Sequence, residues 1–280
     1  GVGPSLSLVY SNDGGSDWIG SGWSLEGLGS IERLGPTYSL SPTYTASDTY
    51  RLNLGGSHKL IYAGTDPSGA TGNYYRTEIE SFQRIEYVST SNSWVVTDKN
   101  GTKYFFGASA ATRQNNPSNT AQVFSWKLES VKDTHGVSWS ISYDKDAVNG
   151  DMYPKQIVYS QGLGLATYRT VDFFYEARPN FSTSYWTGAK IVFDQRLQRI
   201  EVKLGEQLVK KYTLAYTMSA AQARGYASIS QLTSVTETGA DSTTSLPAHT
   251  FTYNVDAVGS SLSVFPTSMT GDPAEGLGGP

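Results

Sequence analysis

The sequence predicts an all-β protein built from antiparallel, hairpin-rich sheets, arranged as a sandwich or a shell-like open sheet, with very little helix. Three observations support this prediction. The composition is rich in aromatic residues and poor in charge, with 19 Tyr, 10 Phe and 6 Trp among 280 residues and only 16% charged residues. Apolar and polar residues alternate with period two in short runs. Gly, Asn and Asp turn residues separate these runs, as in antiparallel sheets.

The alternating runs place the expected strands along the chain. These strands lie at residues 5–11, 50–54, 58–62, 84–88, 94–98, 103–106, 137–144, 169–175, 199–204 and 249–254. Stretches rich in Pro, Ser, Thr and Gly predict long surface loops at residues 36–47, 64–73 and 108–119. A short helix-like pattern occurs only at residues 218–225.

The two ends of the chain bear on its domain organisation. Residues 269–280, MTGDPAEGLGGP, have no alternation, so we expect a Gly- and Pro-rich exit linker toward another domain. Residues 1–268 then form one β-rich domain, a size that all-β domains often reach undivided. The first residues, GVGPSLSLVY, enter a strand almost at once and have no signal-peptide layout, which favours a fragment of a larger protein.

Two of the expected hairpins share one plan. Residues 94–107 and 126–144 each begin with a tryptophan, turn at an Asp-x-x-Gly sequence and return as an aromatic strand. The aspartate can accept hydrogen bonds from backbone amides of the turn, and the glycine adopts a left-handed conformation without steric cost. The turn residues are Asp98 and Gly101 in the first hairpin, and Asp133 and Gly136 in the second.

The segment DWIGSGWSLEGLGSIER, residues 17–33, combines two tryptophans with four glycines. Gly20 and Gly22 permit a crowded backbone, which would bring Trp18 and Trp23 close together over a surface of small residues. The titratable side chains of the segment are Asp17, Glu26 and Glu32. A tight structural corner therefore explains this segment better than a catalytic pocket does.

The residue types exclude several classes of chemistry. The chain has no cysteine, and its three histidines, His58, His135 and His249, are far apart and lack neighbouring ligands at metal-binding spacing. It has no phosphate-binding loop and no dinucleotide fingerprint, so we expect no cofactor and no metal. A net charge of −4 without clustered Lys or Arg excludes nucleic acid as the main partner. No apolar run approaches the ~20 residues of a membrane helix.

Two alternatives to a structural role remain open at this point. Paired carboxylates, with Asp13 and Glu26 or Glu78 and Glu80 as examples, could in principle hydrolyse glycosides if they faced each other across a groove. A surface-exposed module could instead bind glycans or proteins through aromatic loops. The aromatic residues considered for such ligand contact are Tyr74, Tyr75, Tyr185 and Trp186.

The glycine-rich segment is also where the sequence resembles a known family. Residues 5–33 resemble the opening of the SpvB-type (Salmonella virulence plasmid B protein) N-terminal domain, which also begins the B component of insecticidal toxin complexes (Tc toxins). The shared pattern is Leu-x-Leu-x-Tyr, a Gly-rich segment, Gly-x-Gly-Trp-x-Leu and Ile-x-Arg. The resemblance continues in order at residues 48–62, 74–87, 94–107, 126–143, 153–160, 171–180, 196–205 and 246–254, and so covers nearly the whole chain.

The resemblance implies a non-enzymatic structural domain. In Tc toxins this domain belongs to a β-rich assembly, related to Rhs/YD-repeat shells, that encloses a toxic segment. The implied partners are other domains of the same polypeptide or toxin-complex subunits, and the implied location is secreted or on the bacterial cell surface, with cytoplasmic assembly before export as one route. The resemblance assigns structural roles to Trp18, Gly20, Gly22, Trp23, Asp98, Gly101, Trp126, Asp133 and Gly136.

Overall fold

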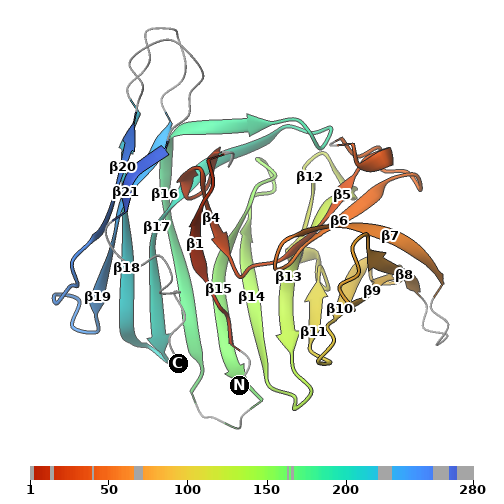
Figure 1. The fold of residues 1–280 in the computed structure, drawn as a ribbon, viewed down its shortest axis with the longest axis horizontal. Helices are drawn as coiled ribbons and strands as arrows, with labels where there is room; N and C mark the ends of the chain where they lie inside the picture. The colour runs from red at the N-terminus through yellow and green to blue at the C-terminus, as the bar shows by residue number, and fades with distance from the viewer. Residues whose placement is uncertain are drawn as a thin grey trace, which may run out of the picture. The chain divides into compact units, whose positions relative to one another are not determined.

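The computed structural model describes residues 3–12, 16–39, 41–65, 72–162, 164, 167–219, 229–254 and 265–269. Antiparallel strands dominate this part of the chain, and its helices are two 3-10 turns, η1 (Pro36–Tyr38) and η2 (Ala110–Thr112). The predicted all-β class is therefore confirmed. The chain, shown in Figure 1, divides into two compact units: unit 1 has residues 1–4, 27–168 and 183–192, and unit 2 has residues 5–26, 169–182 and 193–280.

Eight strands of unit 1 pair side by side into a closed ring. In ring order they are β5 (Ser30–Leu34), β6 (Thr49–Asn53), β7 (Ser57–Thr65), β8 (Gly72–Thr77), β9 (Arg84–Val88), β10 (Ser93–Thr97), β11 (Lys103–Phe106) and β13 (Asn119–Lys132). Every neighbouring pair is antiparallel, and β13 closes the ring by placing Trp126 opposite Ile31 of β5. Closure removes the free edges that an open sheet would leave.

This closure goes beyond the sandwich or open sheet expected from the sequence. The hairpins themselves lie where the alternating runs predict them, because each is encoded by a local pattern and its turn. The pairing of β5 with β13 joins segments that are far apart in the chain. Local alternation shows that both segments are strands but carries no information on which distant strand each one meets.

Three further strands extend unit 1 from β13. β12 (Arg113–Asn116) and β14 (Ser138–Lys145) both pair with β13, and β15 (Met152–Gln161) pairs with β14. The expected surface loop at 108–119 is therefore wrong in part, because it contains η2 and β12. The strand β12 has no alternating apolar pattern because its buried positions are polar. Gln114 is buried, and its side-chain amide donates to the Gly150 carbonyl at 2.8 Å.

Unit 2 contains a sheet and two small strand pairs. The sheet has the order β16 (Arg169–Ser184), β17 (Ile191–Leu204), β18 (Gln207–Met218), β19 (Ser230–Gly239), β20 (His249–Asn254) and β21 (Phe265–Met269), with residues 169–182 of β16 and 193–204 of β17 in this unit. The pairs are β1 (Ser7–Tyr10) with β4 (Trp23–Glu26), and β2 (Ser16–Asp17) with β3 (Gly20–Ser21).

Two expectations concern segments that are mainly outside the described residues. Of the helix-like stretch at 218–225, Met218 ends β18, and residues 220–225 are not described. Of the expected linker at 269–280, Met269 ends β21, and residues 270–280 are not described. Among the residues with a described placement, no helix has the length and apolarity needed to cross a bilayer.

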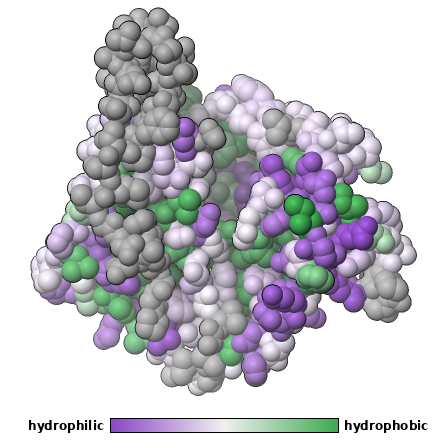
Figure 2. All heavy atoms as spheres, viewed as in Figure 1, coloured by the Kyte–Doolittle hydropathy of each residue, from purple (hydrophilic) through white to green (hydrophobic). Residues whose placement is uncertain are grey.

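Alternation along the strands decides which side chains form the core of unit 1. Trp94 and Val96 of β10 are fully buried, whereas Val95 between them is half-exposed on the other face. Trp126 and Leu128 of β13 are likewise fully buried. Figure 2 shows both hydrophilic and hydrophobic residues on the face of the molecule seen there.

Candidate functional site

The glycine-rich corner of unit 2 depends on a close approach between Gly22 and Tyr10. Next to the β1–β4 pair, the Ser11 N–H donates to the Gly22 carbonyl at 2.8 Å. Gly22 has a φ of +78°, and a Cβ atom at this position would lie 2.6 Å from Tyr10 Cε2 and 2.9 Å from the Ser11 carbonyl oxygen. Only glycine meets both constraints. Gly22 therefore sets how closely the two strands approach.

Trp23 anchors this corner on the sheet of unit 2. Its side chain is 3% exposed, and its indole N–H donates to the Tyr253 hydroxyl at 2.8 Å. That hydroxyl donates in turn to the Leu232 carbonyl at 2.6 Å. Burial raises the pKa of Tyr253 to about 12, although the hydrogen bond from Trp23 opposes the shift, so the hydroxyl stays protonated and keeps its donor. Trp23 also packs on Phe251, with ring centroids 4.6 Å apart.

Trp18 and Gly20 fix the same segment through the main chain. The Leu197 N–H donates to the Trp18 carbonyl at 2.7 Å, and the Trp18 ring meets Tyr175 edge-on at 5.9 Å. Gly20 has a φ of +108°, and a Cβ atom there would lie 3.1 Å from the Ser230 carbonyl oxygen. These contacts clamp the corner against β17 and β19, which is a structural arrangement.

The two Asp-x-x-Gly turns of unit 1 use the same hydrogen bonds. In each turn the aspartate Oδ1 accepts from the backbone N–H groups two and four residues further on, at 2.8 and 3.0 Å for Asp98 and at 2.9 Å for both bonds of Asp133. Gly101 and Gly136 adopt φ values of +85° and +86°. A Cβ atom at Gly101 would lie 2.8 Å from Thr134 Cγ2, so the two turns lie against each other.

Trp126 belongs to an aromatic cluster inside the ring of unit 1. Its side chain is fully buried, and its indole N–H donates to the backbone carbonyl of Asn92 at 2.9 Å and to the Asn92 side-chain oxygen at 3.1 Å. Its ring meets Trp94 and Tyr50 edge-on, each at a centroid distance of 5.9 Å. The members of this aromatic cluster are Tyr50, Tyr75, Tyr87, Trp94 and Trp126.

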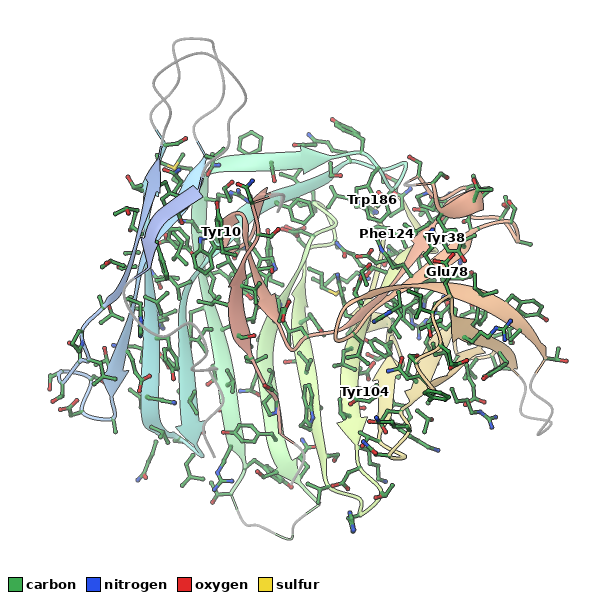
Figure 3. The ribbon with its side chains drawn as sticks, in the orientation of Figure 1. Tyr10, Tyr38, Glu78, Tyr104, Phe124 and Trp186 are labelled. Carbon is green, nitrogen blue, oxygen red and sulfur yellow. The ribbon has the colours of Figure 1, made fainter. Side chains whose placement is uncertain are left out.

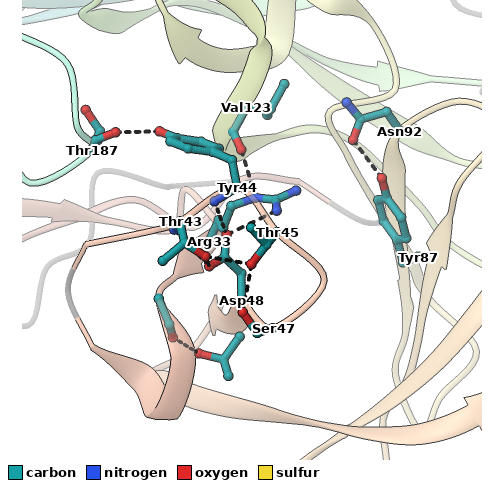
Figure 4. Close-up of polar contacts among 12 residues, drawn as sticks. Arg33, Thr43, Tyr44, Thr45, Ser47, Asp48, Tyr87, Asn92, Val123 and Thr187 are labelled. Carbon is teal, nitrogen blue, oxygen red and sulfur yellow. Dashed lines mark hydrogen bonds and ion pairs between the residues drawn. The ribbon is translucent and has the colours of Figure 1, made fainter.

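Arg33, the arginine of the Ile-x-Arg motif, lies beside the aromatic cluster. Its guanidinium centre is 5.4 Å from the Tyr50 ring centroid and 5.6 Å from that of Trp126. Its Nε donates to the Val123 carbonyl at 3.1 Å, and a terminal nitrogen donates to Asp48 Oδ2 at 3.3 Å (Figure 4). The sequence pattern does not single out Arg33. Alternation along β5 places Arg33 on the inner face of the ring, and a charged side chain is not expected there unless an acidic partner is known.

Asp48 is that partner, and it organises the loop before β6. Its side chain is fully buried and accepts from the backbone N–H and hydroxyl of Thr43 at 2.8 and 2.7 Å, and from the Tyr44 N–H at 2.7 Å. Burial alone would raise the pKa of Asp48, but hydrogen bonds from Thr43, Arg33 and Tyr44 outweigh it and hold the pKa below its ordinary value. The Tyr44 hydroxyl donates to the Thr187 carbonyl at 2.6 Å, which ties the loop to residues 183–192.

The four aromatic residues considered for ligand contact do not form one surface. Tyr75 is only 9% exposed and belongs to the aromatic cluster, whereas Tyr74 is half-exposed. Trp186 is half-buried, and its ring meets that of Phe124 at a centroid distance of 5.8 Å and an interplanar angle of 71°. Both residues are labelled in Figure 3. Tyr185 is 66% exposed. A sugar-stacking platform would need exposed, coplanar rings, and Trp186 does not provide one.

The carboxylates considered for glycoside chemistry have ordinary local roles. Glu78 pairs with Lys59 at 3.9 Å, and Glu80 Oε1 accepts from the Phe82 N–H of its own loop at 2.7 Å. Asp13, considered together with Glu26, is outside the described residues. No group of three or more His, Asp or Glu side chains placed to hold a metal occurs among the residues that the structure describes.

Comparison with known families matches more than half of the chain to a family model. The family model described as SpvB, Salmonella virulence plasmid 65kDa B protein, matches residues 1–162. No curated protein sequence is a significant match to the chain.

Comparison with solved structures shows a shared fold. The N-terminal domain of effector protein SpvB from Salmonella typhimurium strain LT2 has a TM-score of 0.71 and 19% identity, over 85% of this chain and 95% of that one. The crystal structure of TcdB2-TccC3-Cdc42 has a TM-score of 0.70 and 21% identity, and the Photorhabdus luminescens Tc holotoxin pore has 0.71 and 21%. In both, the match covers 89% of this chain but only 15% of the larger one.

Proposed function

Because the chain belongs to the family of the Salmonella virulence plasmid 65kDa B protein, we propose that it is a non-enzymatic structural domain of a secreted bacterial toxin-complex or Rhs-like protein. In this role its sheets form part of a β-shell that encloses or presents a toxic effector. The observation that carries the proposal is the fold, since 85% of the chain superposes on 95% of the SpvB N-terminal domain and 89% superposes on a portion of the TcdB2-TccC3-Cdc42 structure.

The local geometry supports a structural role in a shell rather than a catalytic or ligand-binding role. The ring of unit 1 has no free edge, and its aromatic cluster fills the interior. The motif aspartates Asp98 and Asp133 accept hydrogen bonds within their own turns. Trp186 packs on Phe124, which weakens the case for a glycan-binding module. The partners in this role are other domains of the same polypeptide or subunits of the toxin complex.

The first experiment measures the size and location of the natural polypeptide. An antibody raised against this chain is used to immunoblot cells and culture supernatant of the source organism. The proposal expects a band several times larger than 30.3 kDa in the secreted or cell-surface fraction. A single band near 30 kDa would overturn the toxin-complex assignment, because the domain would then act alone.

A second experiment tests enclosure directly. The natural polypeptide is treated with a dilute protease, and cleavage of the portion outside this chain is followed over time. As a comparison, the same portion is expressed alone and treated in the same way. A shell protects what it encloses, so we expect at least about tenfold slower cleavage in the natural polypeptide. Equal cleavage rates would contradict the shell and leave a different structural role.

A further inference from the structure

A row of polar and cationic side chains crosses six strands of unit 1, from β9 to β15. Each residue of this cationic row lies directly opposite the next one on the neighbouring strand, so all of them share one face. The row consists of Arg84, Thr97, Lys103, Lys132, Ser138 and Gln161. The residues next to them in the chain include Ile85, Val96 and Val131, which are at most 1% exposed. The cationic row therefore lies on the face opposite the core.

Two lysines of the cationic row repel each other. Lys103 and Lys132 are both exposed and occupy directly opposite positions on β11 and β13. Neither forms an ion pair within the described part of the chain. Like charges at opposite positions destabilise a sheet, so this pair has no benefit for the fold itself. Arg84 differs, because it pairs with Glu86 at 2.9 Å.

The acidic residues nearest to these lysines in the chain have another role. Asp98 and Asp133 follow the strands directly, but each turns one carboxylate oxygen to the backbone N–H groups of its own turn. Lys99 is exposed on the first of these turns and also lacks an ion pair among the described residues. The turn end of this face thus presents three unpaired cations.

The next row on the same face mixes apolar and polar residues. In the order of the strands it consists of Glu86, Val95, Phe105, Ser130, Ser140 and Val158. Its three apolar members, Val95 on β10, Phe105 on β11 and Val158 on β15, are half-buried. Val95 lies directly opposite Phe105, two residues from the members of the cationic row on their strands. This face therefore places a half-buried apolar pair, Val95 and Phe105, beside a border of cations, and a protein–protein interface with a polar rim combines the same two elements.

We propose that this face of β9–β15 docks a protein segment that presents carboxylates to Lys103 and Lys132 and apolar side chains to Val95 and Phe105. Charge complementarity identifies the carboxylates, since they would remove the repulsion between the two lysines. A protein fits better than a nucleic acid, because the cations border a row that contains apolar residues and Glu86 instead of forming a broad basic surface, and because the whole chain carries a net charge of −4. The proposal adds a docking surface and is independent of the shell role.

The test uses the full chain and a random copolymer of glutamate and tyrosine as the probe, which offers carboxylates and apolar rings. Binding is measured by fluorescence anisotropy at low salt. The variant Lys132→Glu converts the repelling pair into an attracting one and removes the anion site, so we expect about tenfold weaker binding. Lys190→Glu is the matched control, because Lys190 is also exposed and makes the same charge change away from this face. Its binding should stay within about twofold of wild type.

A stability measurement separates docking from a structural role. Because Lys132→Glu relieves a repulsion, its melting temperature should equal that of wild type or exceed it by about 1–3 °C. Weaker binding together with a lower melting temperature would overturn the proposal, since Lys132 would then stabilise the fold. So would a wild-type chain that does not bind the copolymer, or a Lys132→Glu variant that binds it normally. Preferential binding of phosphatidylserine vesicles or of a DNA duplex would replace the protein partner with a lipid or nucleic acid.

Discussion

Units 1 and 2 bury their sheets in different ways. In unit 1 the sheet closes on itself, and its buried side chains include the aromatic cluster, aliphatic residues of the ring strands and the Arg33–Asp48 pair. In unit 2 the sheet is covered by the corner from β1 to β4, and its central hydrogen bond joins Trp23 to Tyr253, 230 residues further on. The comparison teaches that the first unit spreads its stability over a continuous ring, whereas the second depends on a few contacts between distant parts of the chain.

The largest effect is expected inside the ring of unit 1. Trp126→Ala removes a fully buried ring and leaves a cavity, which should lower the free energy of unfolding by about 3–5 kcal/mol. Chemical denaturation measures the change, and hydrogen exchange shows whether protection falls throughout the ring strands. The control is Trp186→Ala, which removes a half-buried ring with a contact to Phe124 and should cost less. An equal loss of unfolding free energy in the two variants would mean that the aromatic cluster contributes no more to stability than the half-buried Trp186.

The buried ion pair of unit 1 should come next. Asp48→Asn leaves Arg33 without its charged partner and should cost about 2–4 kcal/mol at neutral pH. Because the pKa of Asp48 is lower in the folded state, its contribution is present above the unfolded pKa of about 3.9 and is lost as pH falls through the folded value. The difference in stability between wild type and variant should therefore begin to shrink below about pH 4 and vanish only below the folded pKa of Asp48. A difference that stays constant from neutral to acidic pH would contradict this assignment.

In unit 2 the corner glycine offers a smaller effect. Gly22→Val forces a β-branched residue to a φ of +78° and against Tyr10, at an expected cost of about 1–3 kcal/mol. The matched control is Gly136→Val, because Gly136 also has a positive φ but has open space around it. Thermal melting of both variants separates the backbone strain from the steric clash. If Gly22→Val melts like wild type, the corner does not depend on this close approach.

The smallest effect tests the long-range hydrogen bond of unit 2. Trp23→Phe keeps most of the packing on Phe251 but removes the donor to the Tyr253 hydroxyl, at a cost of about 1 kcal/mol. A double-mutant cycle with Tyr253→Phe isolates the energy of this bond. Hydrogen exchange should increase first in β19 and β20, which the corner covers. A coupling energy of zero would show that apolar packing alone holds the corner.

The ten alternating runs coincide with ten of the 21 described strands, and the long-range arrangement of the strands could not be predicted. Runs such as residues 94–98 and 103–106 alternate cleanly, and they form β10 and β11. β12 was missed because Gln114 and Asn115 are polar yet buried, and their hydrogen bonds compensate for a lack of apolar pattern. Ring closure was missed because pairing of Ile31 with Trp126 leaves no local signal.

The candidate residues divide in the same way. The turn aspartates and glycines could be identified because their roles are local. Asp98, for example, accepts hydrogen bonds from backbone N–H groups at most four residues further along the chain. Arg33 and Asp48 could not, because a buried charge is recognisable only with its partner, and that partner lies on another segment. Tyr75 and Trp186 were considered as exposed contacts, but whether a ring is exposed depends on what packs on it from elsewhere in the chain.

The discontinuous make-up of unit 2 has a consequence for biosynthesis. Residues 5–26 leave the ribosome before residues 27–168, and the strands of unit 2 that they contact are translated after both. Unit 1 can therefore close its ring during synthesis, as soon as β13 has emerged to meet β5. The segment of residues 5–26 can pair β1 with β4 at once, but its contacts with β16, β17 and β19 form only after unit 1 has been translated. The hydrogen bond from Trp23 to Tyr253 is therefore among the latest contacts of the corner to form.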